Sequence, residues 1–260
     1  MTTILVTGGT GTLGRVVVGR LLAAGHDVRS LCRHPHTGTE RPRLRPYAVD
    51  LRDGSGLAPA LAGVETVVHC ASSPRGDTEA AGRLVQAALA AGVRHLVYIS
   101  VVGVDRVPLG YYRTKLDVER LIQDSGLGWT VLRTTQFHDL VLSMVKAGAR
   151  LPVLPVPAGV RLQPVDVREV AARLVELASG APAGRVADLG GPEAHSAHDL
   201  VRDTLRAGGR RRVLVPLWVP GRLFGALRRG ENLALGHADG TVGYGVFLAE
   251  RSGAAMEAGR

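Results

Sequence analysis

Short apolar runs alternate with amphipathic stretches along the first two thirds of the chain. Strands are predicted from β-rich apolar runs at 3–7, 27–32, 47–50, 66–70, 95–100 and 129–133. Helices are predicted from apolar residues at helical spacing, with a glycine close after each one, at 14–24, 77–91 and 111–124. Strands that alternate with helices imply right-handed crossovers and therefore a parallel, doubly wound α/β sheet.

The pattern changes after Gly148. The segment 151–159 (LPVLPVPAG) contains three prolines in nine residues, which excludes a central strand or a helix. Further elements are predicted as a helix at 167–178, a strand at 186–189 and a helix from Ser196 to about 207. We expect one large domain over 1–150 and a smaller cap region over 151–260, of which about 161–190 packs back on the first domain.

The segment 213–227 (VLVPLWVPGRLFGAL) and the chain around it contain prolines and glycines too often for a long helix. We expect this apolar segment to pack in the core or the cap, because surplus apolar surface is normally buried. The alternative is a dimer or membrane-surface patch, and a homodimer is compatible with the sequence.

Composition narrows the class of protein. The 260 residues carry 32 basic and 23 acidic side chains, and 30 of the basic ones are scattered arginines without a nucleic-acid-binding motif, so we expect no specific nucleic-acid partner. Cys32 and Cys70 are the only cysteines, which excludes a disulfide framework and fits a reducing cytoplasm. His195 and His198 lack a spaced third ligand, so no metal site is expected. No apolar run is long enough to span a membrane, and the amino-terminal residues lack the basic start of a signal peptide.

A glycine-rich turn joins the first strand to the first helix. Residues 7–14 (TGGTGTLG) match T-G-x-x-G-x-x-G, in which Gly8 permits the tight turn, Gly11 a close approach to a pyrophosphate, and Gly14 close helix–strand packing. The helix start offers free N–H groups and partial positive charge to phosphates. This context predicts a Rossmann-type domain that binds a dinucleotide. Its expected contacts are Gly8, Thr10, Gly11, Thr12, Leu13 and Gly14. A kinase-type P-loop is excluded because no Lys-Ser/Thr pair follows.

The end of the second strand bears on the choice of cofactor. The sequence there is SLCRHP, without the acid that usually holds the ribose 2′-OH of NAD. Arg33 is placed to bind a 2′-phosphate, so we expect NADP(H) in preference to NAD(H); the alternative is a solvated charge. Asp50 and the following Leu51 are expected to contact the adenine. The alternative is that Asp50 caps a turn. The nicotinamide end is expected to lie on the small residues Cys70, Ala71 and Ser72.

A tyrosine and a lysine lie four residues apart at the start of a predicted helix. Tyr111 and Lys115 therefore share one helix face. A neighbouring ammonium and the positive nicotinamide ring favour the phenolate, so Tyr111 is expected to act as general acid/base. Lys115 is also expected to hold the nicotinamide ribose. Tyr112 is the rival by one residue, and the alternative for Tyr111 is a partly buried anchor of the helix.

These motifs, together with the fifth strand ending at Ser100, resemble the short-chain dehydrogenase/reductase superfamily. The segments 95–100 (HLVYIS), 115–137 (KLDVERLIQDSGLGWTVLRTTQF) and 164–171 (PVDVREVA) are most similar to its atypical, NmrA-like and NAD(P)H:quinone-reductase-like branch. The resemblance covers about 1–190. It implies that Ser100 is near the position of the family's catalytic hydroxyl, but Val101 and Val102 stand at the next positions, where many active members have hydroxyl side chains. The residues after the sixth strand, at the carboxyl side of the sheet, are expected to line the substrate pocket: Gln136, Phe137 and His138.

The function expected from these features is an NADP(H)-dependent oxidoreductase. It would transfer a hydride to or from a small, fairly hydrophobic carbonyl or quinone with assistance from Tyr111 and Lys115. The alternative is a non-catalytic NADP(H)-binding regulator of the NmrA type. A sugar-nucleotide epimerase is a weaker third option, because the C-terminal region is short for gripping such a substrate.

Overall fold

The computed structural model describes residues 2–33, 41–73 and 76–258, which divide into two compact units. The first unit comprises Met1–Ser100, Gly110–Arg133 and Arg168–Ala187, and the second comprises Val101–Leu109, Thr134–Val167 and Asp188–Arg260. The first unit thus contains residues from both sides of position 150. The segment that returns to the first unit, 168–187, lies within the range 161–190 that the sequence analysis singled out.

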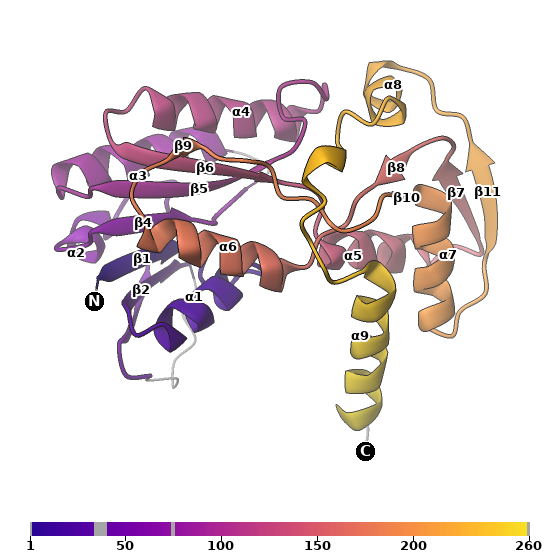
Figure 1. Ribbon diagram of the computed structural model, residues 1–260, viewed down its shortest axis with the longest axis horizontal. Helices are drawn as coiled ribbons and strands as arrows, with labels where there is room; N and C mark the ends of the chain where they lie inside the picture. The colour runs from indigo at the N-terminus through magenta and orange to yellow at the C-terminus, as the bar shows by residue number, and fades with distance from the viewer. Residues whose placement is uncertain (1, 34–40, 74–75, 259–260) are drawn as a thin grey trace. The chain divides into compact units, whose positions relative to one another are not determined.

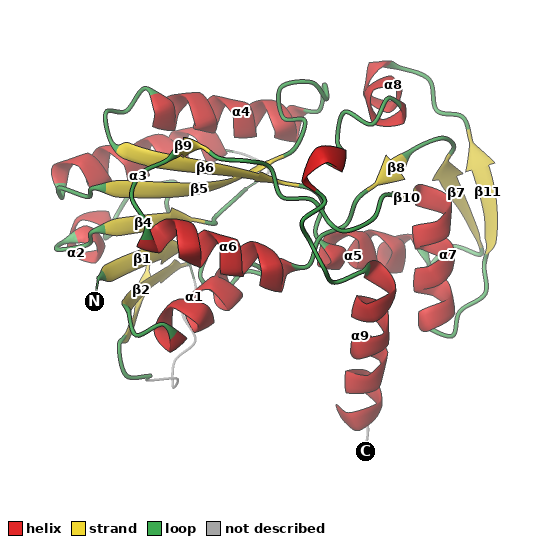
Figure 2. Cartoon of the chain, viewed as in Figure 1, coloured by secondary structure: helices red, strands yellow, loops and turns green. Residues whose placement is uncertain are grey.

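A seven-stranded sheet forms the centre of the first unit, in the order β3-β2-β1-β4-β5-β6-β9 (Figures 1 and 2). Its strands are β1 (Thr3–Thr7), β2 (Asp27–Cys32), β3 (Leu44–Ala48), β4 (Thr66–His69), β5 (His95–Val101), β6 (Gly128–Thr134) and β9 (Gly184–Arg185). The pairs of β1 with β2 and β4, and those of β2 with β3, β4 with β5 and β6 with β9, are parallel. The predicted doubly wound α/β fold is confirmed.

Helices cover both faces of this sheet. They are α1 (Gly14–Ala23), α2 (Leu57–Leu61), α3 (Asp77–Ala90), α4 (Gly110–Gln123) and α6 (Val167–Ser179). Helices α3 and α4 lie on one face, and α1 and α6 lie on the other (Figure 1). Leu5, Val67 and Leu96 from three adjacent strands pack with Leu84 of α3 and Val118 of α4. Because both faces are covered, the central strands are almost continuously apolar rather than alternating.

The second unit is built from short elements. They are α5 (His138–Gly148), β7 (Val153–Pro157), β8 (Arg161–Leu162), β10 (His195–Ser196), α7 (Ala197–Ala207), β11 (Val213–Leu217), α8 (Arg222–Arg228), a 3-10 turn (Leu235–His237) and α9 (Tyr244–Ala258). Strands β8 and β10 pair antiparallel, whereas β7 and β11 pair parallel. Val141, Leu200 and Phe247, from α5, α7 and α9, meet in one core cluster. Among the described residues, no helix is long and apolar enough to cross a membrane.

Three elements differ from the sequence predictions. Strand β3 lies three residues earlier than the predicted 47–50, because Asp50 already belongs to a turn in which its side chain accepts from Arg52 N. The strand predicted at 186–189 does not form: β9 (Gly184–Arg185) lies directly before it, and within 186–189 the structure has an isolated bridge from Leu189 to Thr134. The expectation that the C-terminal part contains no long helix is wrong. The last proline is Pro220, so nothing there prevents α9, which the burial of Tyr244 stabilises.

Candidate functional site

The glycine turn between β1 and α1 is packed so tightly that several of its positions have no room for a side chain. Gly8 has φ +66°, and a Cβ there would lie 2.9 Å from Cα of Ala71, which follows β4. A Cβ on Gly14 would overlap the carbonyl oxygen of Gly8, and one on Gly9 would overlap Oγ of Ser30. Gly9 was not among the predicted site residues, although a second small residue directly after the strand is a signal for such a close contact.

The amino end of α1 is open towards a ligand. Thr10, Gly11 and Thr12 are exposed, while Leu13 and Gly14 are buried beneath them. Leu13 occupies the N-cap position without a side-chain capping bond, and the first turn contains no acidic residue. No acidic side chain of the first turn therefore opposes the partial positive charge at the start of the helix. This arrangement fits the diphosphate of a dinucleotide.

Two arginines border the turn after β3. Arg33 is exposed directly after β2, and the next residues, 34–40, lie outside the described part of the chain. Asp50 accepts from Arg52 Nη2 at 2.6 Å and from its Nε at 3.1 Å. These hydrogen bonds, reinforced by the charge of Arg33, lower the pKa of Asp50 to about 2. Asp50 is thus paired with Arg52, and Leu51 packs against the core of the first unit.

The segment after β4 lies close to the predicted catalytic helix. Ala71 N donates to Oγ1 of Thr7 at 3.1 Å, which ties this segment to the end of β1. Burial raises the pKa of the Cys70 thiol to about 12, with Lys115 acting against this. Ser72 Oγ donates to Asp77 Oδ2 at 3.2 Å and also forms a hydrogen bond with Tyr111. Cys70 and Ser72, which follow β4, are therefore neighbours of Lys115 and Tyr111 in α4.

Tyr111 and Lys115 lie on the first turns of α4 in very different environments. Tyr111 is 42% exposed, whereas Lys115 is 2% exposed. Lys115 Nζ donates to the carbonyl of Ile99 at 3.4 Å and lies 5.8 Å from the centroid of the Tyr111 ring. Burial lowers the pKa of Lys115, and the charge of Asp77 is the largest opposing influence. The pair is thus assembled with its ammonium inside the protein and its phenol at the surface.

The pKa of Tyr111 does not follow the expected direction in the protein alone. Burial raises it above the ordinary value, and the hydrogen bond with Ser72 only partly opposes this effect. The phenol is therefore protonated near neutral pH.

Two further predicted residues are more deeply buried. Ser100, near the end of β5, is 1% exposed, and no described group forms a hydrogen bond with its Oγ. Tyr112 is 8% exposed and packs edge-to-face against Tyr111, with ring centroids 6.2 Å apart. Of the two tyrosines, Tyr111 is the one whose ring reaches the surface.

A row of polar side chains across three strands was missed by sequence reasoning. Thr7, His69 and Tyr98 are consecutive partners in the register of β1, β4 and β5. His69 Nδ1 is 2.7 Å from Thr7 Oγ1, and the His69 ring stacks on Tyr98 at 5.3 Å. Lys115 Nζ lies 4.8 Å from the centroid of the Tyr98 ring. The available signal was a side chain with a polar group in each of three largely apolar runs: Thr7 and His69 end their strands, and Tyr98 lies within its strand.

A buried ion pair anchors α4 to the sheet. Arg133 of β6 donates to both carboxylate oxygens of Glu119, at 2.8 and 2.6 Å, and both side chains are buried. Glu119 is one turn after Lys115 on the same helix, so the pair holds the helix face that carries Lys115.

The predicted pocket residues after β6 belong to the second unit. Gln136 is half-buried and donates to the carbonyl of Asn232 at 3.4 Å, and Phe137 is the N-cap residue of α5. His138 is fully buried, contacts Tyr244, and has Nε2 3.0 Å from the Pro164 carbonyl. The ring of His138 fills the core beside α9, so its exposed fraction is zero. No group of three metal-ligating side chains occurs within the described residues.

The chain is similar to known NAD(P)H-binding proteins. A family model described as NAD(P)H-binding matches residues 8–178. The (4-alkanoyl-5-oxo-2,5-dihydrofuran-3-yl)methyl phosphate reductase of Streptomyces griseus is 35% identical over 218 residues, which is 80% of this chain and 74% of that protein. Quinone oxidoreductase 2 of Escherichia coli is 27% identical, with 80% of this chain and 75% of that protein covered. The structure of the Escherichia coli NADPH-dependent quinone oxidoreductase QOR2 with NADPH has a TM-score of 0.78 at 20% identity, covering 95% of this chain and 99% of that chain.

Proposed function

Because the chain belongs to the NAD(P)H-binding family, in the atypical branch of the short-chain dehydrogenases and reductases, we propose that it is an NADPH-dependent reductase of small, fairly apolar carbonyl or quinone compounds. The observation that carries this proposal is the assembly of Tyr111, Lys115 and Ser72 in the unit that also contains the glycine turn.

The preference for NADPH rests on the charges at the ends of β2 and β3. Arg33 is exposed, and the carboxylate nearby, Asp50, is already paired with Arg52. An NAD site needs an acid that is available to the ribose hydroxyls. A 2′-phosphate instead meets Arg33 and the guanidinium of Arg52, both of which form charge-assisted bonds with phosphate.

The proton for the reduction is assigned to Tyr111. The reduced nicotinamide, when bound, supplies the hydride. Tyr111 is the proton donor because its raised pKa keeps the phenol protonated and its ring reaches the surface. The hydrogen bond with Ser72 orients the phenol oxygen, and Ser72 is itself held by Asp77. Lys115 is placed to hold the ribose through Nζ and to stabilise the phenolate that remains after proton transfer.

The class of acceptor is inferred from the relatives. Their names specify an alkanoyl-oxo-dihydrofuran, a quinone and, for a relative of Xenophilus azovorans that is 28% identical, an azo compound. Each of these acceptors contains a conjugated double bond that accepts a hydride and a proton. We therefore place this chain among reductases of conjugated, electron-poor acceptors.

The test of the acid is Tyr111→Phe, assayed by NADPH oxidation with a panel of quinones and conjugated ketones. We expect kcat to fall by about 10²–10⁴-fold while the dissociation constant for NADPH stays within about twofold. Tyr112→Phe is the matched control and should retain activity. Unchanged turnover in Tyr111→Phe contradicts the assignment, and a loss confined to Tyr112→Phe transfers the role to Tyr112.

The test of the cofactor preference is Arg33→Ala. NADPH affinity is expected to fall about tenfold or more, as for the loss of one charge-assisted bond, while NADH affinity changes little. Arg20→Ala, on the exposed side of α1, is the control. Equal losses for the two nucleotides, measured by calorimetry, contradict a 2′-phosphate contact.

A non-catalytic NADP(H)-binding regulator is the second candidate. The burial of Ser100 favours it, because a hydroxyl that is 1% exposed does not contact a substrate in this conformation. Tight NADPH binding without turnover of any acceptor in the panel is the result that selects this function.

A further inference from the structure

The outer face of the β7–β11 sheet is apolar and uncovered among the described residues of the second unit. In the register of these strands, Val213 pairs with Val153, and Val215 pairs with Pro155. The side chains of this outer apolar face are Val153, Pro155, Val213, Val215 and Leu217, and the exposed Trp218 follows β11 directly. They are exposed, with 62% of Val213 and 65% of Trp218 accessible to solvent.

The opposite face of the same sheet is covered. Leu154 and Val156 of β7 are buried on that face, and α7 lies against it (Figure 1). Parallel strands are normally covered on both faces, so a parallel pair with one bare apolar face is unusual in an isolated chain. From its sequence, this apolar segment is expected to pack in the core or the cap. The structure leaves its outer side chains in water, which requires a different explanation.

The chain segments that contain this face carry charge of one sign. Residues 140–165 and 204–230, which contain both strands and their flanking turns, carry ten basic residues and no acidic ones. The rest of the second unit carries four basic and eleven acidic residues. The basic side chains of the unit are therefore concentrated in the segments that form and flank the outer apolar face. Arg228 also stacks on Trp218, with Cζ 3.9 Å from the ring centroid.

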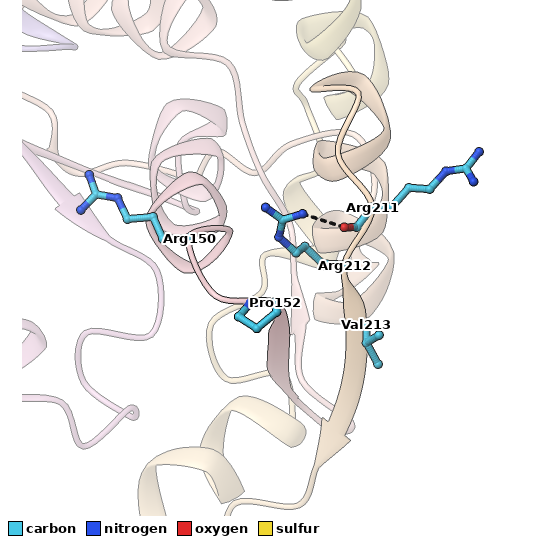
Figure 3. A pocket seen from close by; sticks show the side chains of 5 residues that line it. All are labelled: Arg150, Pro152, Arg211, Arg212 and Val213. Carbon is cyan, nitrogen blue, oxygen red and sulfur yellow. Dashed lines mark hydrogen bonds between the residues drawn. The ribbon is translucent and has the colours of Figure 1, made fainter.

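A basic hollow adjoins the first residue of β11. It has a volume of about 540 Å³ and is lined by Arg150, Pro152, Arg211, Arg212 and Val213 (Figure 3). Arg212 is held in place by bonds from its Nε to the carbonyl of Ala149 at 3.2 Å and from its Nη1 to that of Arg211 at 2.8 Å. Arg150 and Arg211 are exposed. The hollow thus offers positive charge at the edge of the apolar face.

We propose that the outer apolar face docks on the surface of an anionic lipid bilayer. Valine, leucine and tryptophan side chains would enter the boundary between headgroups and acyl chains, and the flanking arginines would bind lipid phosphates. A second copy of the chain fits this face less well than a lipid surface does. In a symmetric contact, the arginines that flank the face on the two copies would lie close together and repel each other. Nucleic acid matches the charge but not the apolar side chains, which have no partner on a phosphate backbone. The docking is independent of the reductase activity.

The first test is flotation of the full chain with lipid vesicles. We expect the protein to float with phosphatidylcholine vesicles that contain about one third phosphatidylglycerol, to stay behind with pure phosphatidylcholine, and to be released by high salt. The variant Val213→Ser/Val215→Ser/Leu217→Ser should lower the partition coefficient at least tenfold. Leu235→Ser/Val246→Ser is the control, since these side chains are 60% and 55% exposed outside the face.

The arginines are tested separately. Arg210→Gln/Arg211→Gln should lower the partition coefficient by about fivefold per arginine at low salt, and both residues are exposed, so folding should not suffer. In a Trp129→Phe background, in which Trp218 is the remaining tryptophan, anionic vesicles should shift its emission to shorter wavelength. Circular dichroism confirms that each variant is folded.

Each contrary result overturns the proposal. Equal binding to neutral and anionic vesicles would show that charge does not drive the docking. An equal fall of the partition coefficient in the control variant would show that the outer apolar face is not the binding surface. Sedimentation that shows a dimer broken by the triple serine variant, without vesicle binding, assigns the face to a second copy. Binding of duplex DNA instead of vesicles assigns the basic segments to nucleic acid.

Discussion

His69 makes the stability of the first unit depend on pH in a calculable way. The ring is 2% exposed, and burial, with the positive charge of Lys115 acting in the same direction, lowers its pKa to about 3 from the ordinary value of 6.5. As pH falls below about 6.5, the unfolded chain binds a proton that the folded chain excludes. The stability that neutral His69 contributes is therefore complete above pH 6.5 and is lost as the pH falls towards 3.

The size of this effect follows from the pKa difference. Each pH unit below the unfolded value costs about 1.4 kcal/mol, so lowering the pH to 5 costs about 2 kcal/mol. His69→Gln removes the titration while keeping a polar group near Thr7. Urea denaturation at pH 7 and pH 5 should show that the wild type loses about 2 kcal/mol more than this variant. His95, whose pKa burial also lowers, titrates in both proteins and cancels.

A matched control is His237→Gln, at an exposed position. This variant should keep the pH dependence of the wild type. If His69→Gln loses as much stability between pH 7 and 5 as the wild type does, the buried ring is not excluded from protonation and the reasoning is refuted.

Two other changes probe the scaffold of the site. Glu119→Ala leaves the buried charge of Arg133 uncompensated and should destabilise the protein by about 3–5 kcal/mol in urea denaturation, whereas Glu119→Ala/Arg133→Leu should cost less than the single change. Gly14→Ala pushes a methyl group against the Gly8 carbonyl and should cost about 1–3 kcal/mol and weaken NADPH binding. Gly19→Ala, with open space in the same helix, should be neutral or stabilise by about 0.5–1 kcal/mol; equal effects of the two glycine variants would refute the packing argument.

Features made by neighbouring residues were predictable from the sequence. The glycine turn depends on residues 7–14, and the shared helix face of Tyr111 and Lys115 depends only on their separation by four positions. Strand and helix alternation likewise gave the parallel sheet, because the apolar spacing of each element is local. Strand β3 shows the limit of prediction from local sequence. A strand was predicted near residue 47, but the residues at which β3 begins and ends depend on its pairing with Val28–Cys32.

Burial and contacts between distant segments were decided by the tertiary structure. The row of Thr7, His69 and Tyr98 exists only because β1, β4 and β5 are adjacent and in register. His138 follows a strand end, as expected for a ligand-binding residue, yet the packing of α9 buries it.

The sequence alone therefore determined the dinucleotide-binding turn, the order of the main elements and the spacing of the Tyr–Lys pair, because each is set by residues within one or two turns of each other. The tertiary structure decided that Lys115 is buried while Tyr111 is exposed, that the pKa of Tyr111 rises, and that β11 leaves an apolar face in water. These properties depend on which groups displace water around a side chain, and those groups come from segments far away along the chain.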